Sequence, residues 1–273
     1  MQNSTISSGT PPAQKRNAAR SELLLVIDVG NTDAVFGLFK GEKLLHNFRI
    51  KSLKDENYVY FEYRFRQYFL EQNLRFSDIK KVVLSSVVPQ LTPIFKALIG
   101  NLFGIEPIVV DAHIFPSIEI SIDNPDEIGS DLVANAVAAY TKYKRNCVIV
   151  DFGTALTFTV VSEEGKVLGV SIAPGLRTAV KALFSNTAQL PEVPLVLPTS
   201  VLGKNSVHAI QSGILWGYEG LVKNMIHNTC RTWRRLHCHC HRRTFFYYFD
   251  TPWRICRSKS RIDFGRFKNN WGK

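Results

Sequence analysis

Two short turns in this sequence carry the same pattern of residues, and that pattern is suited to binding phosphate. The first is residues 28–32 (DVGNT) and the second is residues 151–155 (DFGTA); each follows an apolar run. Glycine lets the backbone approach an anion closely or adopt positive φ, and successive amides with Thr or Asn side chains form an anion-binding nest. The aspartate can hold Mg²⁺ or its waters, which bridge phosphate oxygens during phosphoryl transfer. One such turn is usually a plain β-turn, but two at equivalent places in a repeat predict a phosphate site.

The elements around these turns occur twice along the chain. Apolar runs bounded by turn residues predict strands, and apolar positions at helical spacing predict helices. The predicted strands are residues 23–28, 35–39, 43–50, 81–86, 107–111, 147–151, 156–162 and 166–172, and the predicted helices are 58–72, 91–102, 128–143, 174–184 and 206–225. A unit of strand, turn, two strands and helices opens at Leu23 and again at Cys147. This duplication predicts an α/β protein whose two similar lobes face each other across a cleft.

The positive charge of the chain is concentrated near its C-terminus. The net charge is +11, yet residues 1–226 hold 22 Lys+Arg and 21 Asp+Glu, whereas residues 227–273 hold 12 and 2. A basic nucleic-acid surface is therefore not expected in the first 226 residues, and no run of 18 apolar residues predicts a membrane span. Those residues contain a single cysteine, Cys147, which excludes a disulfide framework. We expect a cytoplasmic protein with no nucleic-acid or membrane partner.

The paired D-x-G turns, of which the first is D-x-G-x-T, resemble those of the acetate-kinase/hexokinase/Hsp70/actin superfamily, whose two ribonuclease-H-like lobes clamp ATP. Five strings in order resemble, more specifically, type III pantothenate kinase. They are residues 28–39 (DVGNTDAVFGLF), 85–89 (SSVVP), 123–138 (DNPDEIGSDLVANAVA), 151–157 (DFGTALT) and 173–176 (APGL). The resemblance covers residues 23–226 and implies two ribonuclease-H-like lobes, each a mixed β-sheet with flanking helices, around an ATP cleft.

The resemblance also implies an activity and a set of site residues. The activity is ATP-dependent phosphorylation of pantothenate to 4′-phosphopantothenate, the first step of coenzyme A biosynthesis, by a homodimer that uses Mg²⁺ and a monovalent cation, K⁺ or NH₄⁺. Asp131 matches the proposed general base, and Asp151 matches the monovalent-cation position. The matched ATP-binding residues are Asp28, Val29, Gly30, Asn31, Thr32, Asp33, Ala34, Val35 and Thr154. The matched pantothenate-binding residues are Gly129, Ser130, Asp131, Leu132 and, by a looser alignment, Thr187.

Two features of the Asp131 segment leave alternatives open. Asp131 opens a predicted helix, where a carboxylate could simply cap the helix N-terminus. The family motif is G-x-D-R, but Leu132 stands where the family has arginine. If that arginine binds the pantothenate carboxylate, leucine cannot replace it, although Arg177 or Lys181 could. The chain could then be a superfamily kinase for another small hydroxyl substrate, or a catalytically inactive regulatory relative.

The composition changes abruptly near Ile226. The last 47 residues hold four of the five cysteines, four of the seven histidines and three of the four tryptophans. The run 237–241 (HCHCH) could bind a metal, but alternate residues of a strand point to opposite faces and cannot close one tetrahedral shell. Arginine pairs beside residues 245–249 (FFYYF) are typical of a single-stranded nucleic-acid binder. We favour a third interpretation, in which residues 227–273 are read out of frame.

The genetic code motivates the reading-frame hypothesis. Histidine codons are CAY and cysteine codons are TGY, so a shift of one nucleotide turns each His of that run into Ile or Thr and each Cys into Val or Ala. The run then becomes an apolar segment typical of a strand.

Four parts are therefore expected in the chain. They are a polar extension at 1–22, an N-terminal lobe at 23–144, an incomplete C-terminal lobe at 145–226 and the out-of-frame tail at 227–273. The extension is either disordered, wrongly included by an early start codon or an organelle transit peptide. Sequencing the gene across codons 220–232 tests the last part, because an intact reading frame there would contradict the hypothesis.

Overall fold

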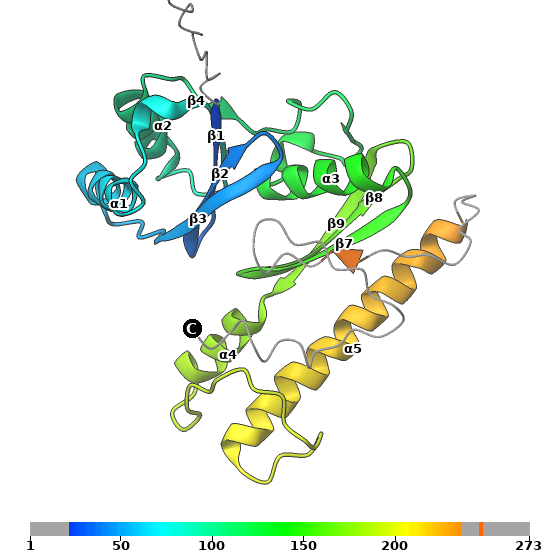
Figure 1. The fold of residues 1–273 in the computed structure, drawn as a ribbon. Coiled ribbons are helices and arrows are strands. Elements are labelled where there is room, and N and C mark those ends of the chain that lie inside the picture. The colour runs from blue at the N-terminus through cyan, green and yellow to red at the C-terminus, as the bar shows by residue number, and fades with distance from the viewer. Residues whose placement is uncertain (1–21, 236–245, 248–273) are drawn as a thin grey trace, which may run out of the picture.

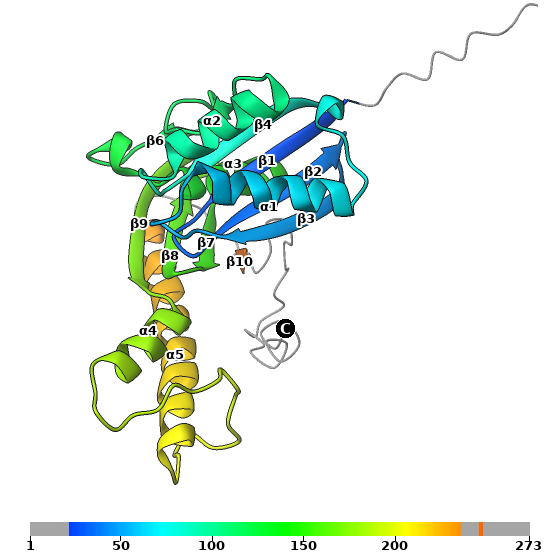
Figure 2. The ribbon, with the colours of Figure 1, turned by 90° about the vertical axis from the view of Figure 1, so that its left-hand side faces the viewer.

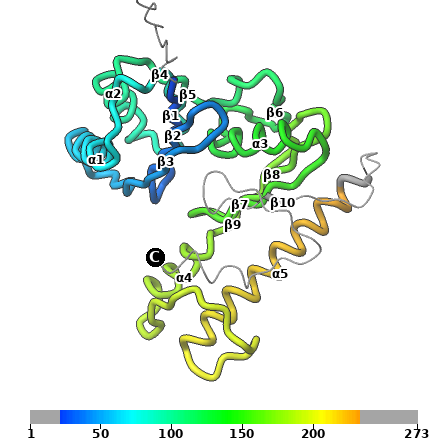
Figure 3. Tube along the Cα trace, in the orientation of Figure 1, coloured from blue at the N-terminus to red at the C-terminus, as the bar shows by residue number. Residues whose placement is uncertain are grey.

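The computed structural model describes residues 22–235 and 246–247. The extension expected at the N-terminus and most of the tail, including the 237–241 run, lie outside the described residues. Two five-stranded sheets form the frame of the molecule, and helices pack against each of them (Figure 1). The trace in Figure 3 runs from the first sheet, in blue, through the second sheet, in green, to a long C-terminal helix.

The first sheet has the strand order β3-β2-β1-β4-β5. Strand β1 (Leu23–Val29) pairs antiparallel with β2 (Asp33–Lys40), which pairs antiparallel with β3 (Lys43–Lys51). On its other side β1 pairs parallel with β4 (Ile79–Ser86), and β4 pairs parallel with the short β5 (Ile108–Val109). The carboxyl ends of β1 and β4 therefore meet at one edge of the sheet.

An aromatic core fixes which face of β1 is polar. Helices α1 (Tyr58–Glu71) and α2 (Thr92–Phe103) cover one face of the first sheet (Figure 2). Leu25, Ile27 and Val29 are fully buried in the core on that face. The largest side chains of this core are Phe36, Phe61, Phe65, Phe69 and Phe95. Since successive side chains of a strand point to opposite faces, burying these residues directs Asp28 to the face away from α1 and α2.

The second sheet has the order β10-β7-β8-β9-β6; four of its strands repeat the order of β4-β1-β2-β3, but β6 pairs with β9, whereas β5 pairs with β4. Strands β7 (Cys147–Phe152), β8 (Ala155–Val161) and β9 (Lys166–Pro174) form an antiparallel meander, as β1, β2 and β3 do. Strand β10 (Phe246–Tyr247) lies parallel to β7, at the place that β4 takes beside β1. The duplication predicted from the sequence is therefore present in the strand order.

Helices cover both faces of the second sheet. Helix α3 (Ser130–Tyr143) packs against one face, where Ala136 and Ala139 contact Ile149 and Val161. The 30-residue helix α5 (Ser206–Arg235) packs against the other face through Val222 and Ile226. Helix α4 (Leu176–Ser185) lies beside the first half of α5. Helix α3 also packs against β4, so it lies between the two sheets (Figure 1).

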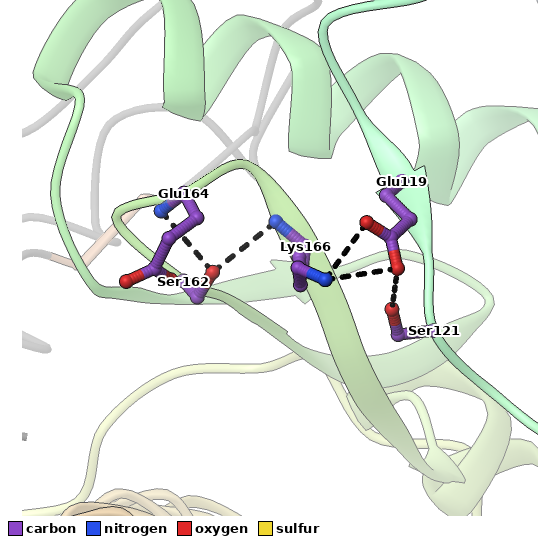
Figure 4. A network of polar contacts seen from close by, with 5 residues as sticks. All are labelled: Glu119, Ser121, Ser162, Glu164 and Lys166. Atoms are coloured by element: carbon purple, nitrogen blue, oxygen red, sulfur yellow. Dashed lines mark hydrogen bonds and ion pairs between the residues drawn. The ribbon is translucent and has the colours of Figure 1, made fainter. Parts of the chain in front are cut away.

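Polar contacts attach the short strand β6 (Glu119–Ile120) to the edge of the second sheet (Figure 4). Lys166 Nζ lies 2.9 Å from Glu119 Oε2, and Ser121 Oγ donates a hydrogen bond to the same carboxylate. The hydroxyl of Ser162 accepts from the backbone N–H groups of Glu164 and Lys166, which closes the turn between β8 and β9. The chain therefore joins the second sheet before residue 145.

The strands and helices predicted from the sequence are confirmed. All eight predicted strands and five predicted helices appear, as β1–β5, β7–β9 and α1–α5. The sequence did not predict β6, β10 or the two 3₁₀ turns, η1 (Phe76–Asp78) and η2 (Pro125–Glu127). It also ended the last helix at Met225, whereas α5 continues to Arg235. Within the described residues, no helix combines the length and apolar character that a membrane span requires.

Candidate active site

The first predicted aspartate lies at the carboxyl end of β1, next to a serine of β4. Asp28 and Ser85 are register partners in the parallel β1–β4 pair. The Ser85 hydroxyl donates a 2.9 Å hydrogen bond to Asp28 Oδ1, and its side chain is buried. The loop that follows is closed by a bond from Gly30 N to Asp33 O, 3.1 Å long. Asp33 in turn forms an ion pair with Lys51, 2.8 Å apart.

The second aspartate, Asp131, lies inside the first turn of α3. The N-cap residue is Gly129 rather than Asp131, but the Asp131 carboxylate accepts from N–H groups of the first turn, so a role in stabilising the helix start stays open beside the proposed catalytic one. Asp131 Oδ1 accepts a 2.8 Å hydrogen bond from Leu132 N. A Cβ atom at residue 129 would lie 2.4 Å from Asp131 Oδ1, so a side chain there would displace the carboxylate from its present position. The side chain of Leu132 is buried, with 6% exposed.

Ser130 joins the start of α3 to the end of β4. Its hydroxyl lies 3.0 Å from Ser85 Oγ and accepts a 3.0 Å hydrogen bond from Ser86 N. Both Ser130 and Ser85 are buried. These contacts hold the helix that carries Asp131 against the strand that contacts Asp28.

The third aspartate, Asp151, lies near the end of β7 and also contacts α3. Asn135 Nδ2 donates a 3.1 Å hydrogen bond to Asp151 Oδ2. Asn135 follows Asp131 by four residues, so the two side chains lie on the same face of the helix, one turn apart. One face of α3 therefore presents the Asp131 carboxylate and the Asn135 amide toward Asp28 and Asp151.

Burial raises the pKa of the Asp28 carboxyl from 3.8 to about 6. The hydrogen bond from Ser85 lowers it, the charge of Asp131 raises it further, and the charge of Arg49 lowers it. Burial likewise raises the pKa of Asp131, and this outweighs the hydrogen bonds from its own N–H and that of Leu132. The charged forms of both groups are therefore disfavoured unless a cation approaches.

Burial raises the pKa of Asp151 to about 7, and repulsion from Asp131 and then Asp28 contributes in the same direction, while the hydrogen bond from Asn135 opposes it. The three carboxyls are thus close enough to perturb one another. Among the residues that the structure describes, no group of three or more His, Cys, Asp or Glu side chains has the geometry to enclose a metal ion by itself. A cation bound here would take ligands from phosphate oxygens or water as well, which is the usual arrangement for Mg²⁺ beside a nucleotide.

The two predicted phosphate turns contact each other. Thr32 Oγ1 and Thr154 Oγ1 lie 2.8 Å apart, although 122 residues separate them in the sequence. Neither Gly30 nor Gly153 has positive φ, so these glycines are not needed for a left-handed backbone. A Cβ atom at Gly30 would lie 3.2 Å from Asp33 O, so close packing of the backbone is what favours glycine at this position.

The amino end of α4 supports the second turn. Gly175 N donates to Thr154 O at 3.0 Å, and Thr178 Oγ1 donates to the same oxygen at 2.6 Å. A Cβ atom at residue 175 would lie 2.2 Å from Gly153 O, so only glycine lets the helix approach this closely. The APGL string ending at Leu176 therefore serves to position the DFGT turn.

The structure brings together most of the predicted site residues. Asp28, Thr32, Asp131, Asp151 and Thr154 converge where the two sheets and α3 meet. Thr187 lies elsewhere: it follows the carboxyl end of α4, opposite the end that contacts Thr154, and its hydroxyl donates to Leu183 O.

Sequence reasoning missed the contacts of Ser85, Asn135 and Gly175. Each of these residues lies in or beside a string that carried the family resemblance, but no local pattern showed what its side chain or backbone touches.

The fold and the site define a class of protein. The protein is a mixed α/β protein with two mixed sheets and flanking helices, and a D-x-G turn follows the first strand of the antiparallel meander in each sheet. A sequence model described as type III pantothenate kinase matches residues 24–228. The chain belongs to the type III pantothenate kinase family.

Individual relatives agree with that assignment. Proteins named type III pantothenate kinase from Geobacter sulfurreducens and Citrifermentans bemidjiense are each 40% identical over 204 residues, covering 75% of this chain and 80% of each relative. Among solved structures, a protein described as a Baf family transcriptional activator from Campylobacter jejuni is 20% identical, with a TM-score of 0.46 over 73% of this chain and 78% of that one.

The raised pKa of Asp151 predicts a stability that depends on pH. Its pKa is higher in the folded than in the unfolded protein, so the ionised side chain destabilises the fold progressively as pH rises from about 4 to about 7. Asp151→Asn keeps the shape and removes the charge. We expect it to raise the free energy of unfolding by roughly 1–3 kcal/mol at pH 8, in denaturant titrations without K⁺, NH₄⁺ or Mg²⁺.

The gain should shrink as pH falls toward 4, where Asp151 is protonated in the folded protein. Asp55→Asn is the matched control, because Asp55 is exposed in the loop before α1. A stabilisation by Asp151→Asn that is the same at pH 8 and pH 5 would contradict the prediction.

Proposed function

We propose that this chain transfers the γ-phosphoryl group of ATP to the primary hydroxyl of pantothenate, giving ADP and 4′-phosphopantothenate, at the start of coenzyme A biosynthesis. The observation that supports this most is family membership over residues 24–228 together with the convergence of both phosphate turns on Asp131. Phosphoryl transfer requires positioning and charge neutralisation more than covalent chemistry. Two hydrogen-bonded turns beside three carboxylates meet that requirement.

In the proposed mechanism Asp131 is the general base. Its carboxylate takes the proton of the pantothenate hydroxyl as the oxygen forms its bond to the γ-phosphorus and the bond from that phosphorus to the bridging oxygen of ADP breaks. Burial raises the pKa of Asp131, which brings its basicity closer to that useful at neutral pH. Gly129 leaves room for the carboxylate, and the first turn of α3 fixes its position.

The backbone N–H groups and hydroxyls of the two turns would bind the phosphates of ATP. The proposed ATP-binding set is Asp28, Val29, Gly30, Asn31, Thr32, Asp33, Ala34, Val35 and Thr154. Thr32 and Thr154 lie within hydrogen-bond distance of each other, so a phosphate could exchange its own bonds for theirs. The proposed pantothenate-binding set is Gly129, Ser130, Asp131 and Leu132, together with Thr187, which lies away from the other four at the carboxyl end of α4.

The carboxylates are suited to hold two cations. Asp28 would hold Mg²⁺ or its waters, and Asp151 would hold K⁺ or NH₄⁺; burial first, and then the neighbouring carboxylates, raise the pKa of each, so a bound cation would stabilise the ionised forms. When bound, Mg²⁺ neutralises the charge that develops on the phosphate oxygens. Ser85 and Asn135 each orient one carboxylate oxygen of these residues.

A different hydroxyl substrate is the second candidate, and the place of Leu132 favours it. The family has arginine at this position, whereas the side chain here is apolar and buried. A small carboxylate substrate would then lack that guanidinium partner. We also propose that the protein is a cytoplasmic homodimer and that its lobes divide at 23–144 and 145–226. The mass in solution, compared with 30.9 kDa for one chain, tests the dimer.

The role of Asp131 is tested by replacing it with a residue of the same shape. We expect Asp131→Asn to lower pantothenate-dependent ADP release by about 10²–10⁴-fold while ATP binding is retained, because only proton acceptance is lost. The assay couples ADP release to pantothenate concentration in Mg²⁺ and K⁺, with Asp123→Asn on an exposed loop as control. A folded wild-type protein that binds ATP but releases ADP only with another hydroxyl compound would move the proposal to the second candidate.

The cations are tested by removal. Chelating Mg²⁺ should abolish ADP release, and replacing K⁺ with tetramethylammonium should lower the rate by at least about 10-fold, since Asp151 then has no cation partner. Asp151→Asn should make the residual rate insensitive to K⁺. Equal rates with K⁺ and with tetramethylammonium in the wild-type protein would show that no monovalent cation is required.

A further inference from the structure

A buried chain of hydrogen bonds links Asp28 to the helix that carries Asp131, and the proposed mechanism uses only its last bond, from Ser85 to Asp28. It runs from Ser86 N to Ser130 Oγ (3.0 Å), from Ser130 Oγ to Ser85 Oγ (3.0 Å), and from Ser85 Oγ to Asp28 Oδ1 (2.9 Å). The four residues belong to three separate elements, β1, β4 and α3. Ser85 is 5% exposed and Ser130 is 8% exposed, so both residues are largely shielded from solvent.

Counting hydrogens gives the direction of this chain. A serine hydroxyl has one hydrogen to donate. The hydrogen of Ser85 goes to the Asp28 carboxylate, so the bond between the two serines must be donated by Ser130. Ser130 in turn accepts from the backbone N–H of Ser86. Every donor therefore points toward Asp28, and aligned hydrogen bonds of this kind strengthen one another.

The same arrangement fixes the spacing of the two aspartates. Ser130 and Asp131 are consecutive residues in the first turn of α3, so a shift of Ser130 moves Asp131 with it. Asp28 and Ser85 are register partners, so they are already fixed to each other by the β1–β4 pairing. Two polar contacts couple these units at the site: the bond from Ser86 N to Ser130 Oγ, and the serine–serine bond, which alone continues to Asp28.

We propose that Ser85 is a positioning residue that, through Ser130, sets the distance between Asp28 and Asp131. Ser85 does not touch the reacting groups in this role. It orients one oxygen of Asp28 and anchors the amino end of α3, so that the metal-facing carboxylate and the base are held at one separation. The inference rests on the proposed function, because it assigns a purpose to the spacing of these two aspartates.

Ser85→Ala tests the proposal, and Ser86→Ala is its matched control. Ser86 is the next residue of β4, and its hydroxyl bonds to Thr92 Oγ1 at 2.8 Å rather than to any site residue. Truncating the Ser86 side chain removes a comparable hydrogen bond and keeps the bond from the backbone N–H of residue 86 to Ser130 Oγ. We expect Ser85→Ala to lower kcat for ADP release by about 10–100-fold with the KM for pantothenate changed less than about threefold, since small misplacements of reacting groups affect the rate most. Ser86→Ala should keep kcat within about twofold.

A double-variant cycle separates positioning from a general loss of stability. If Ser85 and Ser130 act through one bridge, the loss of kcat in Ser85→Ala with Ser130→Ala should be smaller than the product of the two single losses, whereas independent effects would multiply. Thermal unfolding of all variants measures the structural contribution. Equal kcat in Ser85→Ala and Ser86→Ala, or multiplied losses in the double variant, would overturn the proposal.

A binding measurement keeps this test independent of the substrate. Calorimetry gives the affinity for ATP with and without Mg²⁺, and we expect the enhancement by Mg²⁺ to fall about 10-fold in Ser85→Ala and to be unchanged in Ser86→Ala. If the wild-type protein releases no ADP with pantothenate, the proposed function fails and this comparison still decides the role of Ser85. An unchanged Mg²⁺ enhancement in Ser85→Ala would contradict that role.

Discussion

The constraint on which the site depends is the burial of three mutually repelling carboxylates. Asp28, Asp131 and Asp151 come from three elements, and burial raises the pKa of each. Buried charge of one sign is unfavourable unless hydrogen bonds or cations offset it. Here the protein supplies neutral donors to each carboxylate and the charge of Arg49 to Asp28, and these offset the cost of burial only in part. The ionised site would therefore be stabilised further by any cation that binds to it, which would couple its electrostatics to ligand binding.

Helix α3 connects the two halves of the duplicated fold at this site. It packs against β4 of the first sheet and against β7 and β8 of the second. Its first turn holds Asp131 and contacts Ser85, and its second turn places Asn135 on Asp151. Apolar alanines farther along the helix lie flat against the second sheet. The polar start of α3 thus serves both lobes, whereas its later turns belong to one core.

The sequence predicted the parts of this protein that have local or periodic signatures. The strands and helices follow from apolar runs, and the paired turns follow from their repeated spacing, since both are readable within a few residues. The contacts of Ser85 and Asn135 were not predictable in this way. Their carboxylate partners are 57 and 16 residues away in the sequence, and only the strand register and the placement of α3 bring them together. The assignment of Thr187 as a site residue rested on a loose string match, and the single chain does not bring it to the other residues.

The strand order of the second sheet has a consequence for folding during synthesis. In the first sheet the long strands β1 to β4 lie within the first 86 residues, so their pairing closes short loops. In the second, β7 is complete at Phe152, but its parallel neighbour β10 follows roughly 100 residues later. Contacts of such high sequence separation form slowly, because a long loop must close first. During synthesis the first lobe would therefore be complete while the β7 edge of the second lobe is still open. That edge stays unpaired until β10 emerges from the ribosome. A nascent chain of this family would be most exposed to wrong strand pairing there.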